Sequence, residues 1–94
     1  MKHEFAIDLK GVADADALQG VLAASLPLPP DYGRNLDAFY DVLTEYGADW
    51  RIVFRNAGRA ATPLKAVCRD AVAETPGLEI VFEKKRRTVS RRRS

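Results

Sequence analysis

The sequence predicts an α/β fold, in which helical crossovers connect the strands of a small three-stranded parallel sheet. Three segments, residues 3–10, 50–55 and 78–83, have the apolar, branched and aromatic composition of strands. The two long connections between them contain apolar residues at helical spacing. Strands that alternate with helices are typical of parallel sheets. Ninety-four residues are enough for one domain with a single core.

The first strand and the first helix are predicted from alternation and from capping residues. In residues 3–10, the apolar side chains of Phe5, Ile7 and Leu9 alternate with mostly charged ones. Gly11 ends this strand, and Asp14 or Asp16 can cap the helix that follows. Three apolar residues of that helix have helical spacing, Leu18, Val21 and Leu22. The helix is expected to run to about Ser25, because prolines forbid its continuation at Pro27, Pro29 and Pro30.

A second helix is predicted over Leu36–Tyr46, with the side chain of Asn35 as its N-cap. At 100° per residue, one sector is apolar and contains Leu36, Phe39, Val42, Leu43 and Tyr46. The opposite sector, with Tyr40 at its border, contains Asp37, Asp41, Thr44 and Glu45. Carboxylates four residues apart cost an isolated helix about 0.2–0.5 kcal/mol per pair. A solvated face is one explanation of this sector, and a surface that meets a basic partner is the favoured one.

The second half of the chain is predicted to add two strands and a third helix. After the strand at 50–55, Thr62 is the expected cap and Pro63 the first-turn proline of a helix. Its apolar stripe consists of Leu64, Val67, Cys68, Ala71 and Val72. Pro76 and Gly77 end this helix before the strand at 78–83. The three strands are expected to carry Phe5–Leu9, Ile52–Phe54 and Leu78–Phe82. The helices are expected to contribute to the core Leu18, Leu22, Leu36, Phe39, Leu43, Leu64, Val67 and Val72.

Charge divides the chain into an acidic domain and a basic tail. Residues 1–83 contain eight Lys and Arg and thirteen Asp and Glu, a formal charge of −5. Residues 84–94, KKRRTVSRRRS, contain seven cations and no acid. A basic, flexible, solvated tail is the favoured interpretation of these eleven residues. The alternative is sequence-independent binding to nucleic acid through the tail.

The residues that catalysis or cofactors require are scarce. There is one histidine, His3, and one cysteine, Cys68, which is expected to serve as a small buried hydrophobe. No glycine-rich phosphate loop is present, and Asp37 and Asp41 have no further metal ligands or catalytic partners nearby in the sequence. We therefore expect no enzyme activity, no metal and no cofactor. No signal peptide or membrane span is visible, so a soluble, cytoplasmic monomer is expected.

The stretch LPLPPDYGRNLDAFYDVLTE, residues 26–45, closely resembles the inhibitory segment of the barstar family. These small proteins bind and block secreted microbial ribonucleases of the barnase type. The shared features are a proline-containing approach, a Tyr-Gly-x-Asn-Leu-Asp motif and an aromatic-Asp pair in the same helix, all after a first strand and a first helix. The resemblance covers residues 1–83, is most specific over 28–44 and leaves 84–94 outside. It implies a barstar-like inhibitor domain over residues 1–83.

The resemblance implies that a secreted-type microbial ribonuclease binds the acidic helix, one to one. Asp41 would occupy the place of an RNA phosphate in the enzyme, with Tyr40 packed beside it. Together with the acidic sector, the candidate contacts are Asp31, Tyr32, Gly33, Asn35, Asp37, Thr44, Glu45, Tyr46 and Asp70. Three positions depart from a well-known member, which has tyrosine at Asp31, another aromatic residue at Tyr40 and tryptophan at Tyr46. An adaptor that uses this fold for another protein partner is a further alternative.

Overall fold

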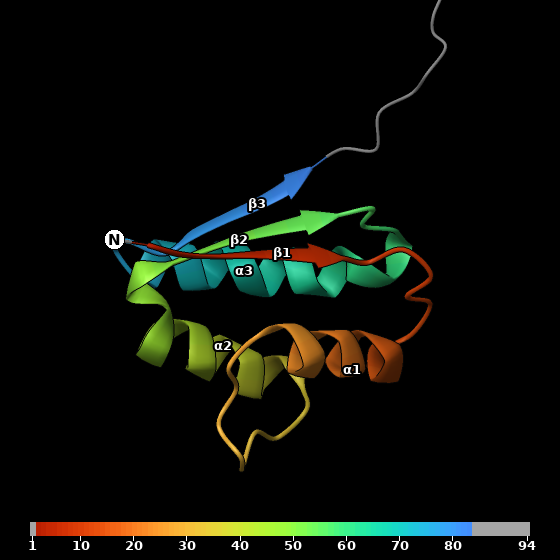
Figure 1. The fold of residues 1–94 in the computed structure, drawn as a ribbon, viewed down its shortest axis with the longest axis horizontal. Coiled ribbons are helices and arrows are strands. Elements are labelled where there is room, and N and C mark those ends of the chain that lie inside the picture. The colour runs from red at the N-terminus through yellow and green to blue at the C-terminus, as the bar shows by residue number, and fades with distance from the viewer. Residues whose placement is uncertain (1, 84–94) are drawn as a thin grey trace, which may run out of the picture.

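The computed structural model describes residues 2–83, which form a three-stranded parallel sheet and three α-helices (Figure 1). The strands pair in the order β1-β2-β3, with bounds His3–Asp8, Trp50–Arg55 and Glu79–Glu83. The helices are α1 (Ala15–Ser25), α2 (Leu36–Tyr46) and α3 (Thr62–Glu74). Short 3-10 segments, η1 (Gly47–Asp49) and η2 (Arg59–Ala61), precede β2 and α3. The predicted parallel sheet with helical crossovers is confirmed, whereas the predictions for the tail concern residues outside this range.

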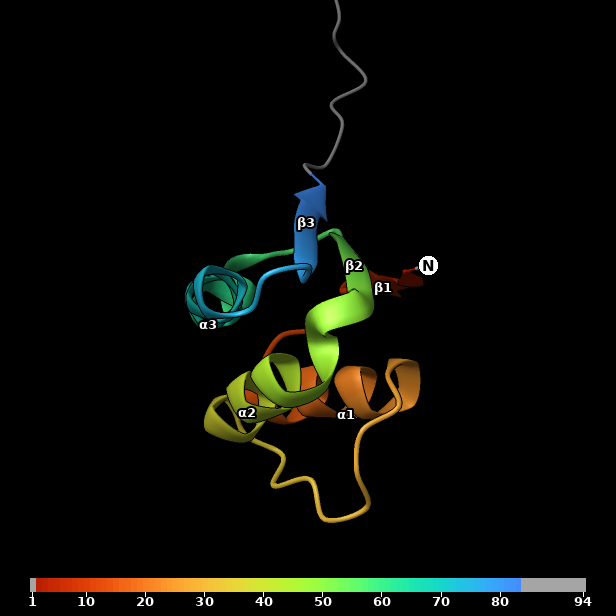
Figure 2. The ribbon, with the colours of Figure 1, turned by 90° about the vertical axis from the view of Figure 1, so that its left-hand side faces the viewer.

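The three helices lie on one side of the sheet, as Figures 1 and 2 show from two directions. The strand side chains on that side form the centre of the core, most completely at Ile52 and Phe54 of β2. Phe54 stacks on Phe82 of β3, with ring centroids 4.9 Å apart, and Phe5 meets Trp50 edge to face at 5.3 Å. No element of residues 2–83 covers the opposite face of the sheet.

Two of the predicted helix caps are confirmed and one is wrong. The side chain of Asp14 accepts a hydrogen bond from the amide of Ala17, and that of Asn35 accepts one from the amide of Ala38, at 2.8 and 2.7 Å. Thr62 is not a cap, because it already has helical backbone angles and α3 starts there. The preceding 3-10 turn supplies the entry to this helix.

Two residues of the predicted apolar helix sectors are exposed. Tyr46 is 51% exposed, because α2 ends there and the inward position one turn after Leu43 belongs to the buried Gly47. Val72 is 37% exposed, because β3 is the outer strand and nothing in the described part of the chain lies beyond it. Leu36 and Val67 are partly buried against the core. The other helix residues predicted for the core are buried at Leu18, Leu22, Phe39, Leu43 and Leu64.

None of the helices within residues 2–83 has both the length and the apolar composition that crossing a membrane requires.

Candidate functional site

Helix α2 presents carboxylates on the side opposite to its core contacts. Phe39 and Leu43 are completely buried and hold the helix against the core. Asp37, Asp41 and Glu45, which together form the acidic face of α2, are exposed. The predicted orientation of α2 is therefore confirmed for these five residues. The packing of the inner side fixes the helix and thereby determines which way the carboxylates point.

The acidic face has no neutralising partner in the described part of the chain. The ion pairs within residues 2–83 involve other carboxylates, and none joins a cation to Asp31 or to the acidic face. Like charges at i, i+4 and i+8 therefore remain exposed on one surface. A surface of this kind attracts cations and cationic proteins.

Three further predicted contacts lie along the same helix, and their side chains are engaged to different degrees. Tyr40 is partly buried against the core at the border of the acidic face. The hydroxyl of Thr44 lies 3.0 Å from the carbonyl oxygen of Tyr40 and 3.2 Å from that of Asp41, so its one proton is donated within the helix. Tyr46 is exposed at the end of the helix, which leaves its ring available to a partner.

The loop before α2 is tied to α1 by two polar contacts. The hydroxyl of Tyr32 donates a hydrogen bond to the side-chain oxygen of Gln19 at 2.5 Å, and burial raises the pKa of this tyrosine. Arg34 lies 3.8 Å from Asp16 of α1 and adopts a left-handed conformation with φ of 54°. Asp31 is exposed in the same loop. The ring of Tyr32 thus supports the loop from within, and its hydroxyl is already engaged inside the protein.

Asn35 and Gly33 shape the start of α2. Besides capping the helix, Asn35 donates from its side-chain nitrogen to the carbonyl oxygen of Gly33 at 3.3 Å. A methyl group on Gly33 would lie 3.4 Å from the Cβ atom of Ala38, which is an ordinary contact. The exposed backbone of Gly33 can therefore be approached closely by a partner, although the fold itself does not require glycine there.

Asp70 differs from the carboxylates of α2. It is exposed on α3, and Arg69 of the same helix lies 3.8 Å from its carboxylate. An exposed pair of this kind contributes little to stability.

Sequence reasoning missed the part played by Gln19 and by Arg34. Gln19 is a buried polar side chain among the apolar positions of α1. A polar residue at such a position was the signal in the sequence that could have indicated a buried hydrogen bond. Its partner Tyr32 lies thirteen residues away in a loop, so helical periodicity could not reveal the pair. The left-handed backbone of Arg34 gave no signal in the sequence, because arginine has no preference for it.

Cys68 and His3, the cysteine and the histidine of the sequence, lie far apart in the chain and on different elements. Cys68 is buried in α3, and burial raises its pKa to about 12, so the thiol is protonated at neutral pH. His3 is exposed at the start of β1, 3.5 Å from Asp49. Within residues 2–83, no three His, Cys, Asp or Glu side chains are grouped so that they could hold a metal ion.

Comparison with known families gives a match that covers almost the whole chain. Residues 2–88 match the family model described as barstar (barnase inhibitor). A search of curated proteins gave no match. The family is one of inhibitors rather than of enzymes. Because the match extends over more than nine-tenths of the 94 residues, this chain belongs to the barstar family.

Proposed function

We propose that this protein inhibits a cationic microbial ribonuclease of the barnase type by covering the enzyme's active site with the acidic face of α2. Membership of the barstar family supports a ribonuclease as the partner. The observation that carries the proposal is that the carboxylates of Asp37, Asp41 and Glu45 are exposed without an ion-pair partner in residues 2–83. The complex contains one copy of each protein.

The chemistry of the partner explains the mode of inhibition. A ribonuclease needs cationic groups to hold an RNA phosphate and to stabilise the charge that develops on it. A carboxylate on a rigid helix satisfies the same groups and contains no bond that the enzyme can cleave. Asp41, in the middle of the acidic face, takes the place of the phosphate. Truncating one member of a buried charge pair across an interface costs about 2–5 kcal/mol.

The remaining candidates surround Asp41 in graded roles. Asp37 and Glu45 extend its field by one turn in each direction, while Tyr40 and Tyr46 contribute aromatic surface. The loop supplies Asp31, the backbone of Gly33 and the outer edges of Tyr32 and Asn35, while Thr44 and Asp70 lie at the rim. The charge of −5 on residues 1–83 favours rapid, salt-dependent association with a cationic enzyme.

A binding and inhibition experiment with a charge-matched control tests the proposal. The full chain is titrated into purified guanyl-specific microbial ribonucleases, including one encoded by the source organism, by calorimetry and by an RNA cleavage assay. Asp41→Asn is compared with Glu4→Gln, which removes one negative charge from the side of the sheet that the helices do not cover. We expect one-to-one binding that only Asp41→Asn weakens strongly. Absence of binding to every such ribonuclease would contradict the proposal.

The basic tail supports a second candidate function. Seven cations in residues 84–94 are enough to contact several phosphates of a nucleic acid without sequence preference. A gel-shift titration of the full chain with single-stranded RNA at 50 and 200 mM salt tests this candidate. A complex that weakens by orders of magnitude over this range would support it, and no complex at low salt would exclude it. If neither a ribonuclease nor RNA binds, the remaining alternative is an adaptor for another protein.

A further inference from the structure

The uncovered face of the sheet has an ordered arrangement of charge. The register places Glu4, Arg51 and Glu79 side by side in one row, and Asp8, Arg55 and Glu83 in another. Between these rows lies an apolar one, Ala6, Val53 and Val81. Each charged row thus has an arginine on the central strand and an acid on each outer strand.

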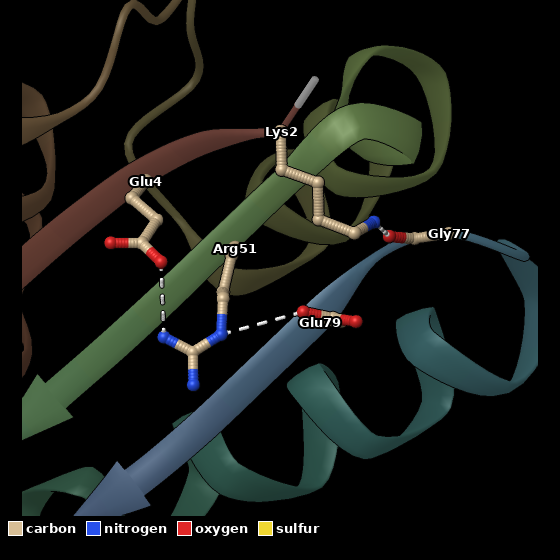
Figure 3. Close-up of polar contacts among 5 residues, drawn as sticks. All are labelled: Lys2, Glu4, Arg51, Gly77 and Glu79. Atoms are coloured by element: carbon tan, nitrogen blue, oxygen red, sulfur yellow. Dashed lines mark hydrogen bonds and ion pairs between the residues drawn. The ribbon is translucent and has the colours of Figure 1, made fainter.

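Ion pairs join Arg51 to both acids of the first row and Arg55 to one acid of the second, while Asp8 accepts a hydrogen bond from Asn56. Arg51 lies 3.4 Å from the carboxylates of Glu4 and of Glu79, as Figure 3 shows, and Arg55 lies 3.3 Å from Glu83. In the same view, Lys2 donates a hydrogen bond to the carbonyl oxygen of Gly77, at the end of the sheet where β3 begins. The two charged rows together contain four carboxylates and two guanidinium groups, a net charge of −2.

The outer edge of β3 has no strand beside it within residues 2–83. Val81 is 38% exposed at this edge, and the side chains of Glu79 and Glu83 are each half exposed. An open strand edge pairs readily with another extended segment. Pairing of two β3 strands around Val81 in antiparallel orientation would place Glu79 opposite Glu83 of the other copy, which like-charge repulsion disfavours.

The chain itself contains a segment that complements this edge. Residues 87–91 read RTVSR, so two arginines flank a valine with the same alternation that Glu79, Val81 and Glu83 have on β3. We propose that residues 87–91 add to the outer edge of β3 as an antiparallel fourth strand, connected by a loop of Lys84, Lys85 and Arg86. Loops of three residues are common in β-hairpins, and an antiparallel strand at the edge of a parallel sheet is a frequent arrangement.

This register matches every pair on the uncovered face. It places Arg87 opposite Glu83, Val89 opposite Val81 and Arg91 opposite Glu79. The charged rows then alternate acid, arginine, acid, arginine across four strands, and the apolar row gains a valine that covers Val81. The two added arginines neutralise the charge of −2 of the two rows. A shift of one residue in the register would place Thr88 or Arg86 opposite Glu83 and would break the pattern.

The side of β3 that faces the helices also favours this register. A groove of about 300 Å³ between α3 and β3 contains Lys65 and Arg69 at its margin, with Lys65 lying 5.6 Å above the ring of Phe82. Arginines of an added strand would be repelled there. In the proposed register, the residues on this side are Thr88, opposite Phe82, and Ser90, opposite Ile80. Both are small and uncharged.

The connectivity favours the tail of the same chain, rather than that of a second copy, as the strand that pairs with β3. Residue 84 follows the last residue of β3, so residues 87–91 start within a few residues of the edge at high effective concentration. A tail of a second copy has to pay the full entropic cost of association. In Figures 1 and 2, β3 and α2 lie on opposite sides of the molecule, so a strand added at the outer edge of β3 leaves the acidic face of α2 free.

Disulfide trapping in the full chain tests the pairing. With Cys68 replaced by Ala, Val81→Cys/Val89→Cys is compared with Val81→Cys/Ser90→Cys, whose second cysteine points to the other face of the proposed strand. On mild oxidation we expect the Val89 pair to form an intramolecular disulfide at least tenfold faster. Equal rates for both pairs, or disulfide-linked dimers as the main product, would overturn the proposal.

Amide hydrogen exchange tests the pairing of β3 with residues 87–91 without introduced cysteines. Arg87→Glu/Arg91→Glu is compared with Arg92→Glu/Arg93→Glu, which changes the net charge equally outside the proposed pairs. We expect the edge-facing amides of β3 to exchange at least fivefold faster in the first variant, and at the wild-type rate in the second. Equal exchange in all three proteins would contradict the fourth strand, whatever the outcome of the ribonuclease experiments.

Discussion

The hydroxyl of Tyr32 lies 2.5 Å from the side-chain oxygen of Gln19, and this contact joins the loop before α2 to the buried side of α1. The ion pair of Arg34 with Asp16 links the same two parts of the chain. A loop that is held in this way has less freedom to lose when a partner binds. The proposed inhibitory surface is therefore preorganised by residues that contact α1.

The first prediction concerns this contact. Tyr32→Phe removes the hydroxyl and leaves the buried side chain of Gln19 without its partner, which we expect to lower the free energy of unfolding by about 1–3 kcal/mol. Chemical denaturation measures the change. Tyr46→Phe is the control, because Tyr46 is exposed and its loss of a hydroxyl should change stability by less than about 0.5 kcal/mol. Equal stability of both variants would show that the Gln19 contact contributes nothing.

The second prediction contrasts two glycines. Gly77 has a φ of 98°, and a Cβ atom there would collide with the carbonyl oxygen of Ala48, so Gly77→Ala forces the backbone to move. We expect a loss of more than about 2 kcal/mol, measured by chemical denaturation. Gly20, in the middle of α1, has open space around it, and Gly20→Ala should stabilise the protein by about 0.5–1 kcal/mol. A tolerated alanine at Gly77 would contradict this account of the turn.

The third prediction is a loss of stability at alkaline pH through Cys68. Burial raises the pKa of this thiol from 9.0 to about 12, so the unfolded chain releases a proton over a range in which the folded protein retains it. The contribution of Cys68 to the free energy of unfolding is complete below pH 9 and falls above it, at up to about 1.4 kcal/mol per pH unit, until about pH 12.

Comparison with Cys68→Ala isolates this effect from the other groups that titrate at high pH. Urea denaturation of both proteins between pH 7 and 10.5 should give a stability difference that is constant below pH 8 and shrinks above pH 9. The variant starts from lower stability because alanine leaves a small cavity. A difference that stays constant to pH 10.5 would show that the thiol is ionised as easily in the folded protein as in the unfolded chain.

Local signals in the sequence were sufficient for much of the fold. Asp14 and Asn35 cap helices through amides only three residues away, so the sequence alone identifies Asn35 and narrows the cap of α1 to Asp14 or Asp16. The alternation of long apolar segments with helical connections predicted the parallel sheet correctly. The inner positions Phe39 and Leu43 follow from periodicity, and with them the outward direction of Asp41.

The features that periodicity could not give depend on distant neighbours. Whether Val72 and Tyr46 are covered depends on which strand is outermost and on where α2 gives way to η1, and neither is encoded within the helix that carries the residue. The uncovered face of the sheet is a property of three strands that come together from both ends of the chain. The partner-binding role of the candidate residues comes from the family resemblance, and the contacts themselves stay a prediction.

The last prediction concerns Asp41, whose carboxylate lies between those of Asp37 and Glu45 along the acidic face of α2. Asp41→Ala removes two repulsive i, i+4 pairs, so the free energy of unfolding should stay unchanged or rise by a few tenths of a kcal/mol. Binding to a partner ribonuclease should weaken by more than about 2 kcal/mol, mainly through faster dissociation, because the basic groups of the enzyme lose their counter-charge. Asp37→Ala and Tyr40→Ala should cost less, since both flank the phosphate position.

Thermal melting and binding kinetics of Asp41→Ala test the two halves of this prediction separately. A clear loss of stability would mean that Asp41 supports the fold, whereas unchanged affinity for a confirmed partner would mean that another residue occupies the phosphate position. Asp14→Ala serves as the opposite control: the loss of its cap should lower stability by about 1 kcal/mol and leave the affinity unchanged. A variant that keeps its full stability but binds weakly has lost a carboxylate that acts on the partner rather than on its own helix.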